Sequence, residues 1–201
     1  MSRTQRKTEG LDAKLVGALD RAGHALDAEL RRSARGAGLT ATQARVLLRL
    51  SAEPVAGRRV GALAAEFDVR QPTVSDAVSA LERKGLVRRR AARDDARAVD
   101  LELTGRGRRV AAGMGAWDER VRVSLSEPAR ERKEAALSLL LDLLGDLNRQ
   151  GVIAEARMCT TCRFFRRCAD APAYCQLLEI ELEPADLRVD CPEHEARRAA
   201  A

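Results

Sequence analysis

Apolar side chains recur every three or four positions over several long stretches of the chain, which is the spacing of helices with one apolar face. The first stretch begins at Leu11 and ends in the glycine-containing segment 35–38. The last begins near Ser126 and runs to about Gln150, with leucines around more than one face. We therefore expect the last helix to be deeply buried or shared with a second subunit.

Between these long helices, the pattern predicts three shorter ones. Thr40 and Gln43 have the spacing of a capping box, in which Thr40 caps a helix and Gln43 reaches back to it. Two more helices joined by a tight turn follow. The second begins around Pro72, where the missing N–H of proline costs nothing, and ends at Gly85.

After Gly85 the pattern changes to that of strands. Segments 86–87 and 99–103 are strand-like, and the second alternates apolar with polar residues. The polar, charged segment between them predicts a β-hairpin with a long basic tip. Thr104 then begins another helix. The predicted fold class is mainly α with a small β-hairpin wing, which is the winged helix-turn-helix.

The charge of the chain favours a polyanionic partner. The formal net charge is +6 and the pI is about 9.5. No apolar run approaches the ~20 residues of a membrane span, and the polar N-terminus has no signal-peptide core. We therefore expect a cytoplasmic protein without membrane association. No nucleophile–base constellation is recognisable, so we do not expect an enzyme.

A helix pair followed directly by a basic hairpin is typical of proteins that bind double-stranded DNA. The stretch from Arg83 to Arg93 holds six basic residues and no acidic one, and it is expected to lie along the sugar-phosphate backbone. The candidate DNA-binding residues are short polar side chains of the second helix and arginines of the hairpin: Gln71, Thr73, Ser75, Ser79, Arg88, Arg89, Arg90 and Arg93.

Several short motifs together resemble the MarR family of bacterial regulators over about residues 11–150. They are Leu-Thr-x-x-Gln at 39–43, Gln-Pro-Thr-Val-Ser at 71–75, Leu-Glu-Arg-Lys-Gly-Leu-Val-Arg-Arg at 81–89, Asp-Ala-Arg-Ala-Val at 95–99 and Leu-Thr-x-x-Gly at 103–107. The resemblance implies a homodimer formed by helices within 11–38 and 104–150, with a DNA-binding winged unit at 39–103.

The resemblance also implies roles for single residues. It implies an ion pair in the wing between Asp95 and Arg97, with Arg97 reaching the minor groove. Many members bind an aromatic acid between the winged unit and the dimer helices, and His24 and Trp117 are candidates to line that cleft. The sequence departs from the family at Ala96, where Arg is usual, and at the recognition-helix cap, where Arg replaces Ser.

The C-terminal segment 151–201 carries a different chemistry. All five cysteines lie there, and cytosolic cysteines so grouped indicate metal binding or redox chemistry. The spacing begins with a C-x2-C pair, which can hold one metal. We favour Cys159, Cys162, Cys175 and Cys191 as ligands, with Cys168 as the alternative.

The identity of the bound group stays open between two chemistries. An iron–sulfur cluster is preferred because the remote Cys191 precedes Pro192, as in bacterial ferredoxins. The C-x2-C-x5-C group also resembles iron–sulfur regulators of the fumarate–nitrate and WhiB types. Zinc is the other choice, and His194 could then replace one cysteine.

These observations predict a repressor whose DNA affinity is modulated by a redox- or metal-sensing C-terminal cysteine site. The alternative is a repressor of the same fold that responds to a phenolic-type small molecule, with zinc as a structural clip. An electron-transfer protein would not need the basic hairpin. Segment 1–10 is predicted to be a flexible basic arm.

Overall fold

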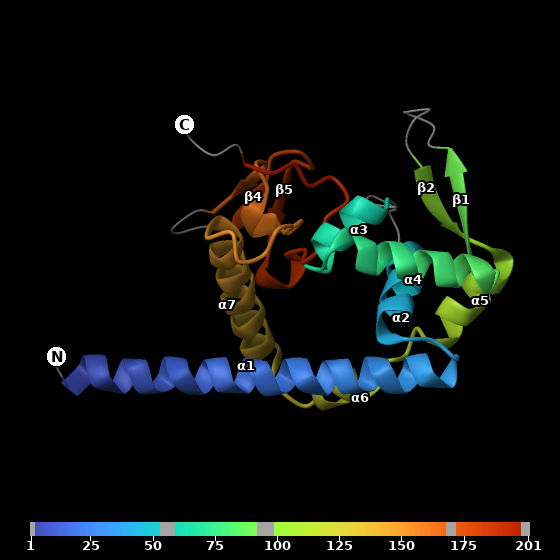
Figure 1. Ribbon diagram of the computed structural model, residues 1–201. Helices are drawn as coiled ribbons and strands as arrows, with labels where there is room; N and C mark the ends of the chain where they lie inside the picture. Colours follow the sequence, from blue (N-terminus) through green and yellow to red (C-terminus); the bar gives the residue numbers. More distant parts are fainter. Residues whose placement is uncertain (1–2, 53–58, 92–98, 168–171, 198–201) are drawn as a thin grey trace.

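The computed structural model describes residues 3–52, 59–91, 99–167 and 172–197, with side chains from residue 10 onward. It is mainly helical, with a two-stranded hairpin and a small three-stranded sheet (Figure 1). None of the helices described is long and apolar enough to cross a membrane. The elements follow in the order α1 Arg3–Gly36, α2 Ala41–Ser51, α3 Val60–Glu66, α4 Gln71–Arg83, β1 Val87–Ala91, β2 Val99–Leu103, α5 Gly105–Gly113, α6 Glu119–Ser124, α7 Arg130–Arg149, η1 Cys159–Thr161, β3 Phe165–Arg166, β4 Ala173–Cys175, β5 Ile180–Leu182 and η2 Pro184–Asp186.

The winged unit, residues 39–103, is built around an aliphatic core. Side chains of α2, α3, α4 and the hairpin meet in it together with the C-terminal end of α1 and with α5. Fully buried members include Leu47, Leu63, Val78, Leu81 and Leu101. The confirmed prediction of a winged helix-turn-helix therefore rests on one continuous apolar core.

Two threonine caps define helix starts as the sequence predicts. The Thr40 hydroxyl accepts a hydrogen bond from the Gln43 N–H, and the Gln43 side chain accepts one from the Thr40 N–H, which completes the capping box. The Thr104 hydroxyl accepts from the Gly107 N–H at the start of α5. Each cap satisfies N–H groups that have no partner within the helix.

Two glycines connect α4, the hairpin and α5. Gly85 ends α4 with φ of 66°, a conformation that side chains disfavour. Gly107 passes so close to β1 that a Cβ there would lie 2.0 Å from the Leu86 carbonyl oxygen. The hairpin can therefore pack on α5 only because residue 107 has no side chain.

The hairpin pairs β1 with β2 antiparallel, from Val87 opposite Leu103 to Ala91 opposite Val99. Its base is buried and its outer part is exposed. The predicted tip residues Arg93, Asp95 and Arg97 lie outside the described residues. Their expected roles therefore stay predictions from the sequence.

The N-terminal prediction of a flexible basic arm at 1–10 is wrong for the part described, because α1 already begins at Arg3. The charged residues there continue the helix that the apolar spacing indicates only from Leu11. A polar run with good helix formers can extend an existing helix.

The C-terminal boundaries also differ from expectation. The helix that starts at Thr104 ends at Gly113, before Trp117, and a short α6 precedes the last helix, which begins at Arg130. Gly151, with φ of 73°, follows α7 as predicted. Periodicity did not reveal these breaks because the apolar spacing continues across them.

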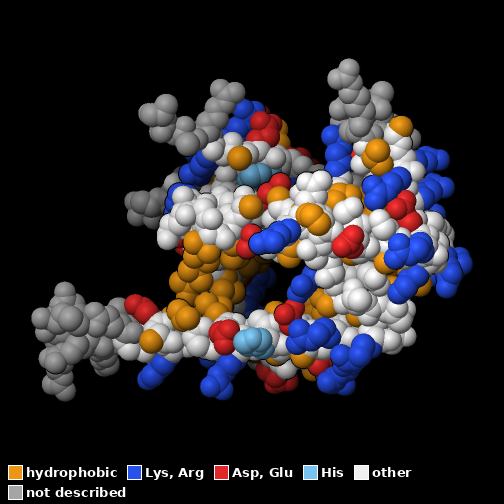
Figure 2. All heavy atoms as spheres, viewed as in Figure 1, with side chains coloured by type: hydrophobic (Ala, Val, Ile, Leu, Met, Phe, Trp, Pro, Cys, Tyr) orange, Lys and Arg blue, Asp and Glu red, His pale blue; other side chains and the backbone are white. Residues whose placement is uncertain are grey.

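The long helices leave apolar side chains exposed within one chain. On α7 only Leu141 and Gly145 are buried. Figure 2 shows hydrophobic atoms gathered along α7, on the side that faces the viewer. Of the two expectations for the last helix, deep burial is wrong for the isolated chain. The exposed large apolar residues of α1 and α7 are Leu11, Leu15, Val16, Leu19, Leu26, Leu139, Leu140 and Leu143.

The cysteine segment, residues 151–197, is a separate small structure at the C-terminal end of α7. Strands β3, β4 and β5 form an antiparallel sheet in that order. η1 and η2 pack against α7. The Thr160 hydroxyl donates to the Leu141 carbonyl, and Arg167 pairs with Asp142 at 2.7 Å. The segment is thus fastened directly to the last helix.

Candidate DNA-binding surface and cysteine cluster

The sequence of α4 places polar side chains opposite its buried face. Val74, Val78 and Leu81 point into the winged core. The helix begins at Gln71 with Pro72 in its first turn, and no side-chain hydrogen bond caps it at Arg70. A helix supported in this way by α2 and α3 can enter the major groove as a rigid rod.

The predicted DNA-reading residues of α4 lie on its outer side. Gln71 and Thr73 are exposed, and Ser75 and Ser79 are half-buried. Their amide and hydroxyl groups can donate and accept hydrogen bonds with base edges and phosphates. Gln71, Ser75 and Ser79 follow at intervals of four residues and so share one face of α4, whereas Thr73 is exposed on a different side of the helix.

The exposed arginines of β1 are held by carboxylates. Arg88 donates to Glu102 at 2.8 and 3.1 Å, and Arg90 lies 3.5 Å from the same group. Arg89 donates to Glu82 of α4 at 3.0 Å. Sequence reasoning missed both carboxylates, and the structure shows that Glu102 lies opposite Arg88 in the hairpin.

Lys84 has a structural role that the sequence did not reveal. Its ammonium donates to the Gly38 carbonyl at 2.7 Å and to Gln43 Oε1 at 3.1 Å. It thereby ties the end of α4 to the turn between α1 and α2. The expectation that the whole basic stretch from Arg83 lies along DNA is corrected here, because this ammonium is used within the fold.

Exposed basic side chains are grouped on the hairpin and at the C-terminal end of α4. Figure 2 shows Lys and Arg side chains grouped on that side of the molecule. The exposed basic residues there include Arg83, Arg88, Arg89 and Arg90. Clustered positive charge next to a helix with an exposed polar face is the electrostatic footprint of a DNA-binding unit.

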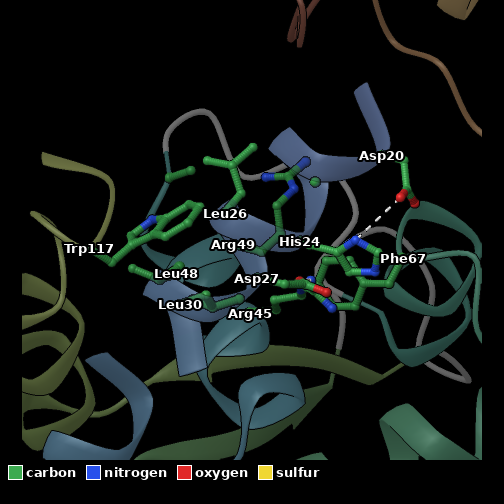
Figure 3. Close-up of a pocket in the computed structure, with 12 residues that line it drawn as sticks. Asp20, His24, Leu26, Asp27, Leu30, Arg45, Leu48, Arg49, Phe67 and Trp117 are labelled. Carbon is green, nitrogen blue, oxygen red and sulfur yellow. Dashed lines mark hydrogen bonds and ion pairs between the residues drawn. The ribbon is translucent and has the colours of Figure 1, made fainter. Parts of the chain in front are cut away.

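A cavity of about 740 Å³ lies between α1, α2 and the segment after α5. Trp117, Leu30 and Leu48 supply apolar walls, while Arg45 and Arg49 bring charge (Figure 3). His24 lines it too and pairs with Asp20 at 3.5 Å, as the dashed line in Figure 3 marks. Both residues that the family resemblance suggested for a cleft, His24 and Trp117, therefore line this cavity.

Four cysteines are described in the C-terminal segment, and all are free thiols. Cys159 and Cys162 are buried with Phe165 and Leu182, and Cys175 packs against this cluster. The C-x2-C pair folds as the single turn η1, in which the Cys162 N–H donates to the Cys159 carbonyl at 3.0 Å. Cys168, the alternative ligand, lies outside the described residues.

The loop 188–191 closes over the first cysteine. The Arg188 N–H donates to Cys159 Sγ at 3.2 Å, and the Cys159 N–H donates to the Arg188 carbonyl at 3.0 Å. The Cys191 N–H donates to the Arg157 carbonyl at 2.7 Å. These paired bonds fix Cys191 beside the C-x2-C turn although it is remote in sequence.

The electrostatics of the thiols show that they share one environment. Burial raises the pKa of Cys159, the Arg188 N–H lowers that pKa, and the charges of Cys191, Cys175 and Cys162 raise it. Burial likewise raises the pKa of Cys191. The four thiols that the sequence favoured as ligands therefore influence one another and would resist joint ionisation without a cation.

Among the residues described, no group of three or more His, Cys, Asp or Glu side chains is placed so that it could hold a metal ion. The four thiols are neighbours, but their atoms do not form a finished coordination site. His194, the other candidate zinc ligand, is half-buried and lies 3.0 Å from the Thr161 hydroxyl through Nε2. Burial lowers the pKa of His194, which favours the neutral imidazole.

Comparison with known proteins identifies the winged unit. Residues 37–98 match the model of the MarR family. The structure of the MepR–DNA complex of S. aureus is 23% identical, with 66% of this chain and 97% of that chain covered and a TM-score of 0.57. No curated protein sequence matches this chain.

Two further solved structures agree in fold. The transcriptional regulator PA3341 is 29% identical over 67% of this chain and 98% of its own, with a TM-score of 0.61. The MarR family transcription regulator SP03579 is 23% identical over 75% of this chain and 99% of its own, also at 0.61. The chain therefore has the MarR winged-helix fold, and the solved structures that share this fold include transcription regulators. The matched family model ends before the first cysteine.

Proposed function

We propose that this protein is a transcription repressor that binds double-stranded DNA as a homodimer, with an affinity modulated by a group bound at its C-terminal cysteines. The observation that carries the DNA-binding part is the position of α4. It exposes Gln71 and Thr73 in its first turn, and its other end leads into the arginine-bearing strand β1, on a unit that matches the MarR family. The relative MepR has been solved in complex with DNA.

We expect DNA binding to replace ion pairs within the hairpin by ion pairs with DNA phosphates. The carboxylate of Glu102 holds Arg88 and lies near Arg90 in the free protein. On DNA, phosphates would replace this carboxylate around the same guanidinium groups. Such contacts release counterions, so each lost phosphate contact lowers the salt slope of log K by about one.

The test uses a duplex selected by the full chain from a random-sequence pool. We expect Arg88→Ala to weaken binding and to reduce the salt slope by about one unit. The matched control is Arg120→Ala, which removes an exposed arginine of α6 that pairs only weakly, at 3.6 Å, with Glu29. Equal slopes for wild type and Arg88→Ala would show that the hairpin does not touch DNA.

The dimer follows from the apolar surfaces of the long helices. Leu139 is 56% exposed and Val16 is 67% exposed, which is unusual for apolar residues at regular helical spacing. A second copy would cover these faces, and to bind successive major grooves the dimer must hold its two α4 helices about 34 Å apart. We expect Leu140→Asp to give monomers by light scattering and to abolish operator binding. Leu177→Asp, an equally exposed leucine of the cysteine segment, should leave both unchanged.

The donor chemistry of the cysteine cluster suits a thiophilic metal or an iron–sulfur cluster. Cys159, Cys162, Cys175 and Cys191 share one environment, and the N–H of Arg188 already donates to one sulfur. A bound cation would neutralise four thiolates that otherwise repel one another. Because the thiols are not placed to hold a metal as they stand, binding must draw them together.

The nature of the bound group decides between sensing chemistries. An iron–sulfur cluster would supply a redox-active and oxygen-sensitive centre, whereas zinc would supply a rigid cross-link. The test is anaerobic purification, a visible spectrum and metal analysis, with operator affinity measured before and after air or a chelator. A brown protein whose affinity changes supports a cluster sensor. One zinc per chain with affinity indifferent to mild oxidant would leave a structural clip.

The cavity supports the alternative function of a repressor that responds to a small molecule. Its volume of about 740 Å³ and its mixed walls of Trp117, Leu30 and Arg45 suit an aromatic acid. The chain has a single tryptophan, so its fluorescence reports on this cavity. Quenching by a phenolic acid such as salicylate, with release of DNA at the same concentration, would favour this alternative.

A further inference from the structure

One ion-pair network joins the cysteine segment to the winged unit. The carboxylate of Asp190 lies 3.6 Å from Arg49 of α2 and 3.4 Å from Arg157. Arg49 also donates through Nε to both oxygens of Glu66 on α3, at 2.6 and 2.7 Å. Asp190 thus connects the loop that carries Cys191 with two helices that support α4.

The two sides of this network differ in rigidity. The Arg49 side chain is only 10% exposed, while that of Asp190 is 53% exposed. Arg49 stands on α2, whose neighbours Leu47 and Leu50 are buried in the winged core. A shift of the guanidinium therefore acts on packed helices, whereas the Asp190 carboxylate is attached to the backbone of the cysteine segment.

Hydrogen bonds to the cysteines set the position of Asp190. It is preceded by Arg188, whose N–H donates to Cys159 Sγ, and followed by Cys191, whose N–H donates to the Arg157 carbonyl. Arg157 returns a bond of 3.1 Å to the Cys191 carbonyl. Anything that draws Cys159 and Cys191 together must therefore also move the backbone that carries Asp190.

We infer that Asp190 transmits the state of the cysteine centre to the DNA-binding unit through Arg49. The inference rests on the proposed function, because it requires both a bound group and DNA binding. Filling the centre would tighten the 188–191 loop and hold Asp190 against Arg49. Emptying or oxidising it would relax the loop and weaken the Asp190–Arg49 pair, which would change how α2 and α3 support α4.

The same arginine also faces the cavity that holds Trp117 (Figure 3). A change in the ion partners of Arg49 therefore alters the charge around the indole of the chain's single tryptophan. This gives a readout that does not depend on DNA. Emptying the cysteine centre should shift the emission of Trp117, and this shift should require Asp190.

The experiment compares full-length wild type with Asp190→Asn, Asp190→Glu and the control Glu181→Gln. Glu181 is an exposed carboxylate of β5 for which the described structure records no ion pair. For each protein we measure the bound metal or cluster per chain, Trp117 emission, and affinity for the selected duplex. Each is measured before and after metal removal by a chelator or cluster loss in air.

We expect wild type and Glu181→Gln to change DNA affinity about tenfold, within the usual range of coupling between two sites. Asp190→Asn should bind the same metal or cluster but lose most of this change and the Trp117 shift, and Asp190→Glu should restore part of both. Full coupling in Asp190→Asn would overturn the inference and leave the proposed function standing. A wild type that binds no metal or cluster, or whose affinity ignores its loss, would overturn the cysteine-dependent function and this inference together.

Discussion

The winged unit and the cysteine segment are stabilised by different kinds of interaction. The winged unit buries a continuous, mainly aliphatic set of side chains contributed by five helices and a hairpin. In the cysteine segment the buried cluster consists of Cys159, Cys162, Phe165 and Leu182. Segments with so few apolar residues usually need a metal or a host domain to stay ordered. The winged unit therefore folds by apolar burial, whereas the cysteine segment depends on its thiols and on its contacts with α7.

The largest expected effect comes from removing one thiol. Cys162→Ser should abolish the bound group, whose contribution to folding in small zinc domains is about 10–16 kcal/mol. We expect segment 151–197 to become sensitive to trypsin at Arg163 and Arg166, while the winged unit keeps its resistance. Mass spectrometry of the fragments checks this result.

Cys168→Ser is the matched control for that experiment, since it removes a thiol outside the favoured four. It should keep the bound group and the protease resistance. Loss of the group in Cys168→Ser, with retention in Cys162→Ser, would show that the ligand set is wrong.

A cavity introduced by substitution into the winged core should destabilise the winged unit and leave the cysteine segment unchanged. Leu47 is 0% exposed, and Leu47→Ala should lower the free energy of unfolding by about 2–5 kcal/mol. Urea unfolding followed by circular dichroism measures the change, and metal or cluster content should stay constant. Leu177→Ala, at a leucine that is 44% exposed, should change stability by less than about 0.5 kcal/mol. A parallel loss of bound metal in Leu47→Ala would mean that the two regions fold as one.

The contact between the hairpin and α5 is the next most sensitive point of the winged unit. Gly107→Ala would place a Cβ 2.0 Å from the Leu86 carbonyl oxygen, so backbone must move. We expect a loss of about 1–3 kcal/mol, as for other overpacked sites. Gly113→Ala, where nothing lies within 4 Å of the added Cβ, should be neutral or slightly stabilising. Equal melting temperatures for the two variants would contradict the close approach.

The smallest expected effect concerns the surface of the winged unit. Glu102→Gln removes the carboxylate that holds Arg88 and lies near Arg90. Stability should fall by less than about 1 kcal/mol, because exposed ion pairs contribute little. DNA affinity at low salt should rise by up to about fivefold, because the arginines no longer have to break an ion pair with Glu102 before they bind phosphate. Unchanged affinity, with Glu119→Gln of α6 as the control, would mean that these arginines do not exchange partners.

Much of the winged unit could be predicted because its signals are local. The capping box of Thr40 and Gln43, Pro72 at the start of α4 and Gly85 at its end each act within one turn of backbone. The alternation in 99–103 likewise predicted β2, whereas its register with β1 came from the structure. The breaks around α6 were missed because an apolar period of three to four continues through a short interruption.

Less of the cysteine segment could be predicted. The sequence grouped the cysteines in one segment, and the four that are described, Cys159, Cys162, Cys175 and Cys191, influence one another's ionisation. It did not predict the β3–β4–β5 sheet, because strands of two or three residues are too short to show alternation. Nor did it show that the thiols are free and not placed to hold a metal.

The sequence alone determined the helices and caps of the winged unit, the hairpin, the basic surface and the grouping of thiols, since each depends on residues close together in the chain. Only the tertiary structure decided which charges meet. Lys84 donates hydrogen bonds to Gly38 and Gln43, and Arg89 donates to Glu82. Arg49 forms ion pairs with both Glu66 and Asp190. The physical reason is that an ion pair between two elements depends on how they pack, and packing is set by the whole apolar core rather than by any local pattern.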